Sequence, residues 1–368
     1  MICTLKVKLL PSLEQHSLLL ATMHRFNEAC DYISRVAFEQ KVFGQVRLHK
    51  ECYYPVRANY GLSSQFAVRA IGKVVESYKV DKKHIHTFRP VGAVVYDDRL
   101  LSFNGLDEAS LLTLEGRVKV PMILGQYQKG VIEGRRIRGQ ADLILVDGIF
   151  YLMLAVELPD GSPIDTTDFL GVDLGIKNIA ADSDGDTYSG GEVNGLRHRH
   201  ARLRAKLQAK GTKSAKRLLK KRRRKESRFA ADVNHTISKR LVAKAKGTGR
   251  GIALEDLQGI RDRVTVQKAQ RRTHHSWSFH QLRSFVQYKA VLAGVSVVLV
   301  DPRNTSRTCP ECGTIDKRNR PTRDRFLCIS CGHAGPADSI AALNIRVRAG
   351  LMSSSHTQGD LAPASPRL

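Results

Sequence analysis

The chain has 368 residues, 42% of them hydrophobic and only 6% aromatic, and 60 Lys and Arg against 35 Asp and Glu give a formal charge of +25. This length is sufficient for two or three domains with separate cores and excludes a single small domain. No long apolar run and no charged-then-apolar leader occurs, so we expect a cytoplasmic protein without a membrane partner. The positive charge favours nucleic acid as the partner, the alternative being a basic, ribosome-like or merely well-solvated protein.

The first 160 residues predict helices followed by a β-rich region. Thr4 to Leu9 alternate as a strand does, Pro11 and Ser12 would begin a helix, and helical periodicity continues with breaks to about Val80. From residue 86 the pattern changes to short β-rich segments separated by Gly and Asp, at 93–96, 117–120, 141–146 and 150–156. These segments predict a small barrel or twisted sheet that the first strand can join. Pro159 to Thr167 would separate this half from the next.

The second half predicts an α/β layer with helices packed on a central sheet. The expected strands are 169–174, 178–182, 251–254 and 295–300, and helical segments lie between them. Residues 351–368 are rich in Ser and Pro and predict a disordered tail.

A basic segment lies between the second and third of these strands. Residues 197–228 contain sixteen Lys or Arg and a single acid, Glu226. Leucines at near-helical spacing predict one or two basic helices, which could lie along a phosphate backbone; the alternative is a solvated helical face. The candidate nucleic-acid contacts are Arg217, Lys220, Lys221, Arg222, Arg223, Arg224, Lys225 and Arg228.

Four of the seven cysteines form two C-x-x-C pairs, Cys309 with Cys312 and Cys328 with Cys331. This spacing allows two turns to offer four thiolates to one tetrahedral Zn²⁺, which would be structural because no coordination position stays open. Two disulfides are the alternative, and the odd cysteine count argues against them. His333 could replace one ligand.

Three acids stand where carboxylates are costly unless they bind a metal or a hydrogen-bond donor. Asp173 lies in an apolar strand, Glu255 ends another strand, and Asp338 opens the last helix. Together they could hold two Mg²⁺ ions for phosphodiester hydrolysis. Taken singly, Asp173 could be a strand-end acceptor, Asp338 a helix N-cap, and Asp256 could take the place of Glu255.

These motifs, taken in chain order, resemble the TnpB (OrfB) proteins of insertion sequences, which are relatives of the type V CRISPR effectors. The segments that carry the resemblance are residues 169–178, 252–257, 305–313 and 331–338, and the likeness extends to residues 9–15, 25–27, 234–242 and 277–289. The resemblance implies an RNase H-like (RuvC) domain at 168–302 and 336–350 with an inserted zinc ribbon at 303–335. It also implies a wedge β-barrel at 1–10 and 86–165 that carries a helical recognition insertion at 11–85.

What the resemblance implies for function is RNA-guided cleavage of double-stranded DNA beside a short adjacent motif, in a prokaryotic cell and in association with the nucleoid. The cofactors would be a guide RNA, Zn²⁺ and Mg²⁺, with Asp173, Glu255 and Asp338 catalytic; monomer and dimer both stay open. Ile340 departs from the family because an Asn is common at that position, which predicts weaker support of the metal. The alternatives are a transposase or resolvase of RNase H-like type, a compact CRISPR effector, and a guided DNA-binding repressor.

Overall fold

The computed structural model describes residues 1–135, 137–222, 224–257 and 279–356. The chain forms two compact units, Met1–Pro159 and Asp160–Leu368, and each is built on its own sheet. Across the described residues, no helix combines the length and the apolar character that crossing a membrane requires.

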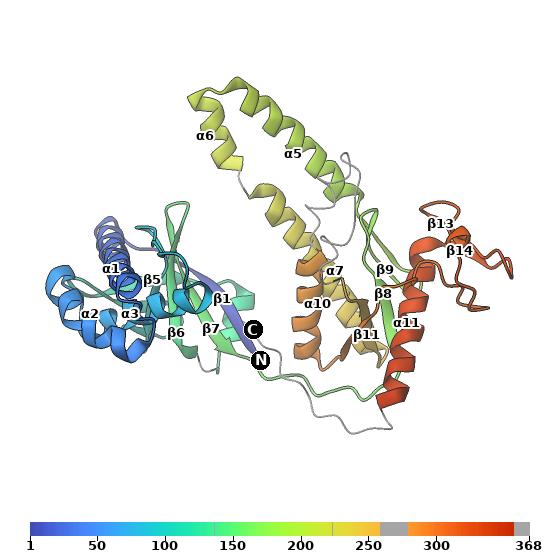
Figure 1. Ribbon diagram of the computed structural model, residues 1–368, viewed down its shortest axis with the longest axis horizontal. Helices are drawn as coiled ribbons and strands as arrows, with labels where there is room; N and C mark the ends of the chain where they lie inside the picture. The colour runs from blue at the N-terminus through green and yellow to red at the C-terminus, as the bar shows by residue number, and fades with distance from the viewer. Residues whose placement is uncertain (136, 223, 258–278, 357–368) are drawn as a thin grey trace. The chain divides into compact units, whose positions relative to one another are not determined.

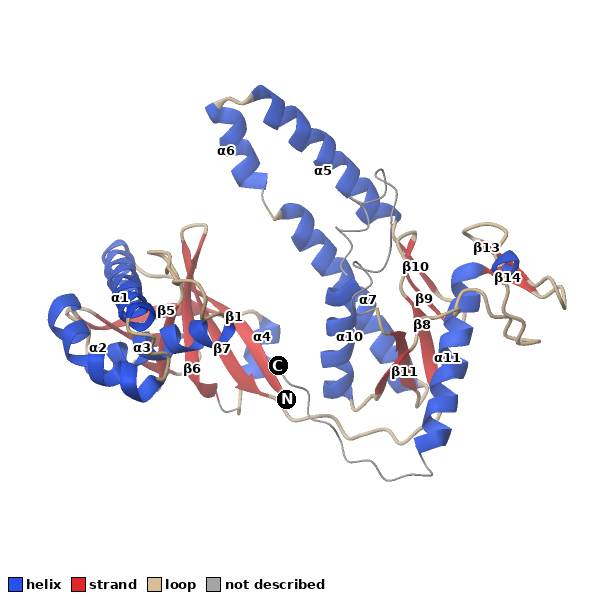
Figure 2. Ribbon diagram, in the orientation of Figure 1, coloured by secondary structure: helices blue, strands red, loops and turns tan. Residues whose placement is uncertain are grey.

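The first unit contains a seven-stranded antiparallel sheet, drawn in red in Figure 2. Its strands are β1 (Ile2–Leu9), β2 (Val94–Asp97), β3 (Leu101–Asn104), β4 (Glu108–Thr113), β5 (Gly116–Ile123), β6 (Ile137–Val146) and β7 (Ile149–Glu157), and helix α4 (Gln126–Ile132) follows β5. The strand order is β2-β6-β7-β1-β5-β4-β3, so the first strand lies in the middle. Because the edge strands β2 and β3 are joined by a short turn, the sheet curls into a nearly closed barrel, as the sequence predicts.

Three helices occupy the chain between β1 and β2, namely α1 (Leu13–Glu39), α2 (Gln45–Tyr60) and α3 (Ser64–Val80). Ser12 begins α1 with a capping box: its hydroxyl accepts a bond from the Gln15 N–H, and the Gln15 side chain accepts one from the Ser12 N–H. The helices share a core that includes the fully buried Phe26, Phe66 and Tyr78. The prediction of helices as far as Val80 is therefore confirmed.

The second unit contains a five-stranded mixed sheet in the order β10-β9-β8-β11-β12 (Figure 1). Its strands are β8 (Phe169–Asp173), β9 (Asn178–Asp182), β10 (Thr187–Ser189), β11 (Gly251–Glu255) and β12 (Val297–Val300). Strands β8, β11 and β12 are parallel, whereas β9 and β10 form an antiparallel hairpin beside β8. Helices α7 (Lys225–Gly247) and α10 (Phe279–Ala293) cover one face, and α11 (Ala337–His356) covers the other.

Alternation along the strands decides which side chains face α11. Leu170 and Val172 of β8, with Ile252 and Leu254 of β11, pack in the core beneath α7 and α10. Phe169 and Ala253 point to the opposite face, where α11 lies. Since successive side chains alternate, Asp173 and Glu255 also fall on the α11 side, and they directly follow Val172 and Leu254, which are paired across the two strands.

Helix α11 approaches β8 most closely at Gly171. A Cβ atom at this position would lie 2.1 Å from the Ala342 carbonyl oxygen and 2.6 Å from the Arg346 nitrogen, both of which are backbone atoms of α11. Only a residue without a side chain allows the helix to lie this close to the strand, and the contact positions the start of α11 over the strand ends.

We expect Gly171→Ala to destabilise the second unit by about 1–3 kcal/mol, because the added methyl group forces α11 away from the sheet. Chemical denaturation of the full chain, followed by circular dichroism, measures this change. The matched control is Gly247→Ala in the last turn of α7, where a Cβ has nothing within 4 Å. That control should be neutral or slightly stabilising, and equal effects of the two changes would contradict the close approach.

Two features differ from the expected boundaries. Helix α11 continues to His356, so residues 351–356 are helical where a disordered tail was predicted, and residues 357–368 lie outside the described part of the chain. Ile345 and Ala349 anchor the helix on the sheet, and each further residue adds a hydrogen bond at low entropic cost. The last strand begins at Val297 rather than at residue 295.

The basic segment 197–228 forms two helices and the start of a third, where one or two were predicted; together they are called the arm. Helix α5 (Gly191–Lys210) runs outward, α6 (Lys213–Arg222) folds back beside it, and α7 begins at Lys225 (Figure 1). Gly211 makes the turn between α5 and α6 in a left-handed conformation with φ +62°.

Candidate active site

Asp173, Glu255 and Asp338 line one cavity of about 310 Å³ at the carboxyl ends of β8 and β11. The first two come from adjacent strands, and the third comes from the first turn of α11. Although more than 80 residues separate each acid from the next in the sequence, the fold brings them to one place. This is the arrangement that the sequence predicted for the three acids.

Electrostatic repulsion within this cavity is evident at Asp173. Burial, together with the nearby Glu255 and Asp338 carboxylates, raises the pKa of the Asp173 carboxyl to about 8, and Arg320 opposes this rise. Burial also raises the pKa of Glu255. A divalent cation among these oxygens would relieve the repulsion, and an all-oxygen donor set suits Mg²⁺. These residues could therefore hold the metal that the sequence predicts.

Glu255 and Asp256 point in different directions, which resolves the ambiguity between these neighbours. Glu255 faces the cavity, and its Oε1 accepts a hydrogen bond of 2.5 Å from the Thr305 hydroxyl. Asp256 instead forms an ion pair of 2.9 Å with Arg283 of α10. Asn344 of α11 donates two bonds of 2.7 Å to the carbonyls of Thr305 and Thr308 and so fixes the loop that carries the Thr305 hydroxyl.

Asp338 receives its hydrogen bond from β9. The Asn178 side-chain amide donates to its Oδ2 at 2.9 Å, and the Arg320 guanidinium lies 3.8 Å from its Oδ1. Ile340, which stands where the family commonly has an Asn, is buried instead of facing the carboxylates. It packs against the cysteine module, the segment 303–335 that contains the two cysteine pairs. Asn178 therefore supplies the amide that donates to this acid. Asp338 keeps a hydrogen-bond partner although residue 340 is Ile.

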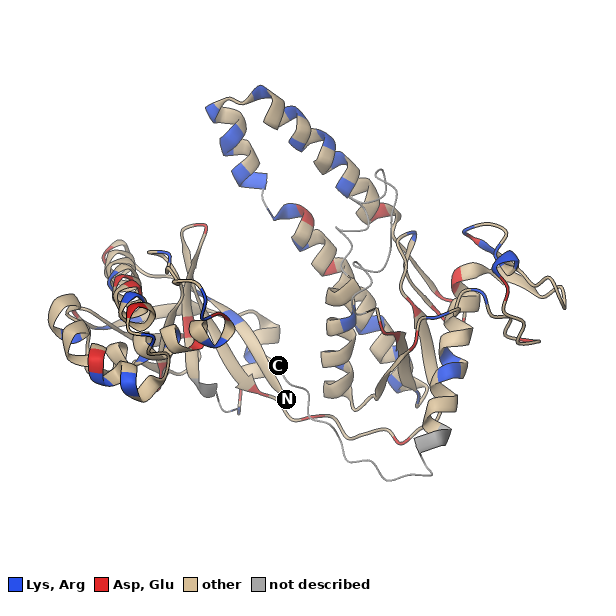
Figure 3. Cartoon of the chain, in the orientation of Figure 1, with Lys and Arg blue, Asp and Glu red and all other residues tan. Residues whose placement is uncertain are grey.

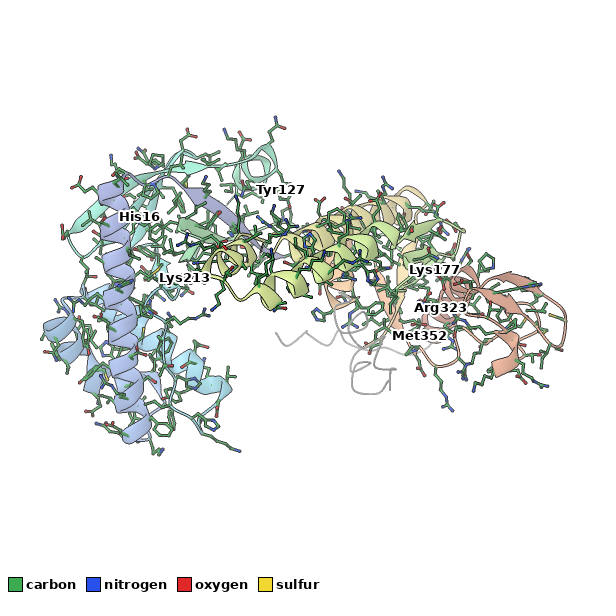
Figure 4. The ribbon with its side chains drawn as sticks, turned by 90° about the horizontal axis from the view of Figure 1, so that it is seen from above. His16, Tyr127, Lys177, Lys213, Arg323 and Met352 are labelled. Carbon is green, nitrogen blue, oxygen red and sulfur yellow. The ribbon has the colours of Figure 1, made fainter. Side chains whose placement is uncertain are left out.

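Three cations join the carboxylates around the cavity: Lys177 follows β8, and Arg320 and Arg323 belong to the cysteine module. Figure 4 labels Lys177 and Arg323, which lie close together at this part of the second unit. Lys177 forms an ion pair of 2.6 Å with Asp324. Cations beside a cluster of carboxylates are suited to holding a phosphate in place.

Sequence reasoning did not identify these three cations, nor Thr305, Asn178 and Asn344 as supporting groups. Thr305 and Asn178 lie inside the segments that carry the family resemblance, so the sequence held a signal for them. Arg320 and Arg323 lie between the two cysteine pairs, where many bases occur and spacing alone does not single any of them out.

The four cysteines of the zinc motif converge as predicted. Their sulfur atoms all lie within 4.8 Å of one another, and the Sγ atoms of Cys309 and Cys331, and of Cys312 and Cys328, are 3.5 Å apart. Such a set of four sulfurs can bind a metal such as zinc. Gly313 and Gly332 follow the two pairs with φ of +72° and +75°, conformations that favour glycine at these turns. His333 stays outside the group and packs edge-on against Phe326.

The cysteine module is attached to the start of α11. Cys309, Phe326 and Cys328 form a buried cluster with Ile340, which lies two residues after Asp338. The hairpin of β13 (Arg325–Leu327) and β14 (Ala334–Pro336) leads directly into the helix. The module therefore positions both Asp338 and the arginines of the cavity.

The predicted nucleic-acid contacts lie on the arm, where blue segments gather in Figure 3. Arg217, Lys220, Lys221 and Arg222 belong to α6, and Lys225 and Arg228 belong to α7, with Arg224 just before it. All of these except the half-buried Arg222 are exposed, and Arg223 lies outside the described residues.

A carboxylate cavity at the ends of parallel strands, beside a four-cysteine module, defines a protein with a candidate metal-dependent catalytic site. Two family models match the chain: "Probable transposase" (OrfB_IS605) over residues 154–258 and "Cas12f1-like, TNB domain" over residues 279–345. A TnpB-like protein of Methanocaldococcus jannaschii is 30% identical over 267 residues, which cover 67% of this chain and 92% of that protein. The chain therefore belongs to the TnpB (OrfB) family.

The CRISPR-associated endodeoxyribonuclease Cas12f1 of Sulfoacidibacillus thermotolerans is 32% identical over 216 residues, 54% of this chain, and the match spans only 50% of that relative. Among solved structures, a Cas12f1–sgRNA–target DNA complex gives a TM-score of 0.65 at 13% identity and covers 94% of this chain and 98% of that one. This likeness shows a shared fold, which matches the predicted resemblance.

Proposed function

We propose that this chain is an RNA-guided DNA endonuclease whose reaction takes place in the cavity of Asp173, Glu255 and Asp338. The observation that carries the proposal is the convergence of these acids, with basic side chains beside them, in a member of a family whose relatives include endodeoxyribonucleases. The hairpin and parallel strands of the second sheet support an RNase H-like assignment for this unit. In the first unit, the barrel and its inserted helices would be the wedge and recognition regions.

The three carboxylates would hold the magnesium ions, which when bound supply an activated water and neutralise charge at the phosphate. Thr305 and Asn178 orient two of these carboxylates by donating hydrogen bonds. Arg320 and Lys177 would hold the scissile phosphate next to the acids, since both line the cavity. The exposed bases of the arm would bind the nucleic-acid backbone without reading its sequence.

The test is to express the protein with its native flanking DNA and to sequence the RNA that copurifies. Cleavage is then assayed on DNA that matches the variable end of this RNA. One discrete RNA that directs magnesium-dependent cleavage supports the proposal. A second candidate, strand transfer by a transposase, is favoured by the description of the matching family model over residues 154–258. Absence of a discrete RNA, with joining of transposon ends, would establish that candidate instead.

We expect Thr305→Val to raise the magnesium concentration for half-maximal cleavage by about 10–100-fold, because Glu255 loses the hydroxyl that orients it. Cleavage rates across a magnesium titration measure this shift. Thr187→Val is the control, since Thr187 is an exposed residue of β10 that does not line the cavity. An unchanged titration for Thr305→Val would show that the hydroxyl does not support the metal.

A further inference from the structure

A second cavity, of about 680 Å³, lies within the arm and shares no lining residue with the carboxylate cavity. Residues of α5, α6 and α7 supply most of its lining, together with Gln281 of α10. Its apolar lining comes from Leu203, Leu207 and Leu219, and its charged lining includes Arg197, Arg204 and Arg224. A surface that combines apolar side chains with guanidinium groups fits a nucleotide, which has a flat apolar base and an anionic phosphate.

Glu226 is the acid of this lining and the only acid among residues 197–228. Its carboxylate lies between two arginines of α5: Arg204 NH2 is 3.1 Å from Oε2, and Arg197 Nε is 3.9 Å from Oε1. The Arg197 side chain is only 11% exposed, and burial lowers the pKa of its guanidinium while Glu226 raises it. The Glu226 carboxylate therefore places an anion between α5 and α7.

The geometry points to a phosphate site in the arm, in which the Glu226 carboxylate holds the position that a backbone phosphate of bound nucleic acid takes. A carboxylate and a phosphate offer arginine the same kind of acceptor oxygens. Binding would transfer Arg204 and Arg197 from Glu226 to the phosphate, while the leucines accommodate the adjoining sugar or base. This inference rests on the proposed function, because it assumes that the chain binds nucleic acid.

The consequence is that Glu226 competes with the ligand. We expect Glu226→Gln to bind nucleic acid about 3–10-fold more tightly than the wild-type chain near physiological salt. The logarithm of its association constant should also fall more steeply with the logarithm of salt, by about 0.9 for duplex DNA or about 0.7 for single-stranded RNA, since one more phosphate is neutralised.

Fluorescence anisotropy of the full chain without magnesium measures both quantities. One experiment uses labelled duplex DNA, and a second uses labelled single-stranded RNA. The experiment that gives the larger gain in affinity identifies the source of the phosphate. Glu192→Gln is the matched control, because Glu192 is an exposed acid of α5 outside the cavity and its change removes the same charge. Equal gains in affinity for the two variants in both experiments would overturn the inference.

Two further measurements keep the test decisive if Glu226→Gln is less stable. Inorganic phosphate should raise the Tm of Glu226→Gln more than that of the wild-type or Glu192→Gln chain, because it restores the missing anion. Adding Arg204→Gln should remove the gain in affinity. Equal phosphate shifts in all three chains, or a gain that survives the loss of Arg204, would reject the site. Guided cleavage by the wild-type chain is independent of this result, so either idea can fail alone.

Discussion

Asp173→Asn is expected to lower the rate of magnesium-dependent DNA cleavage by at least about 100-fold. Loss of a group that merely orients a metal ligand typically costs 10–100-fold, and Asp173 would be a ligand itself. The change keeps the size of the side chain, so the fold and RNA binding should be retained. Cleavage under single-turnover conditions, together with the yield of copurified RNA, measures both effects.

The same variant should be more stable than the wild-type chain when no metal is bound. Because the pKa of Asp173 is about 8 in the folded protein and about 4 in an unfolded chain, the folded state holds a proton that the unfolded state releases. The stability of the metal-free protein therefore falls as pH rises from about 4 to about 8. Asn does not ionise, so the gain in Tm should be near zero at pH 4 and largest at pH 8 and above.

The control for both effects is Asp256→Asn, which removes an acid that pairs with Arg283 away from the cavity. Its cleavage rate should stay within about threefold of the wild-type rate, since a partly exposed ion pair contributes little. If Asp173→Asn still cuts DNA at the wild-type rate, the three acids are not the reaction site.

Cys309→Ser should have the largest effect on stability. It removes one of four sulfurs that would bind zinc, and structural zinc binding is coupled to folding. The buried contacts of the module with Ile340 would also be lost, which releases the start of α11 together with Asp338. We expect loss of the bound zinc, a fall in Tm of more than about 10 °C in the second unit, and loss of cleavage.

Cys3→Ser is the matched control, because Cys3 lies in β1 of the other unit and takes no part in the cysteine cluster. This variant should keep one zinc ion per chain by elemental analysis and should cut DNA normally. A Cys309→Ser protein that retains zinc and a wild-type unfolding curve would mean that the module is held together in another way.

The sequence was most informative where chemistry restricts the residue type. Paired cysteines at fixed spacing and carboxylates at the ends of apolar strands point to a metal whatever the surroundings. The structure brings the members of each set together. The choice between Glu255 and Asp256 was different, because both follow the same strand. The positions of Thr305, which donates to Glu255, and of Arg283 on α10, which pairs with Asp256, show which of the two faces the cavity.

Contacts that depend on tertiary packing were not predictable in this way. Arg320 reaches the cavity through the path of the cysteine module, and no local pattern distinguishes it from other bases. The fold of the arm was not predicted, since the spacing of the leucines indicates that helices form but not that α6 turns back at Gly211. Likewise, the Ser-rich composition after residue 350 predicted disorder, whereas the packed turns before it allow the helix to continue.

The order of the acids along the chain has a consequence for the timing of synthesis. Asp173 and Glu255 leave the ribosome well before Asp338, which sits on the last helix of the described residues and depends on the cysteine module for its position. A nascent or prematurely terminated chain that ends before residue 338 therefore lacks both the third carboxylate and the helix that covers one face of the sheet. Under the proposed function such a chain would not cut DNA, so strand breakage would require molecules that have been translated through residue 338 and have bound their metal.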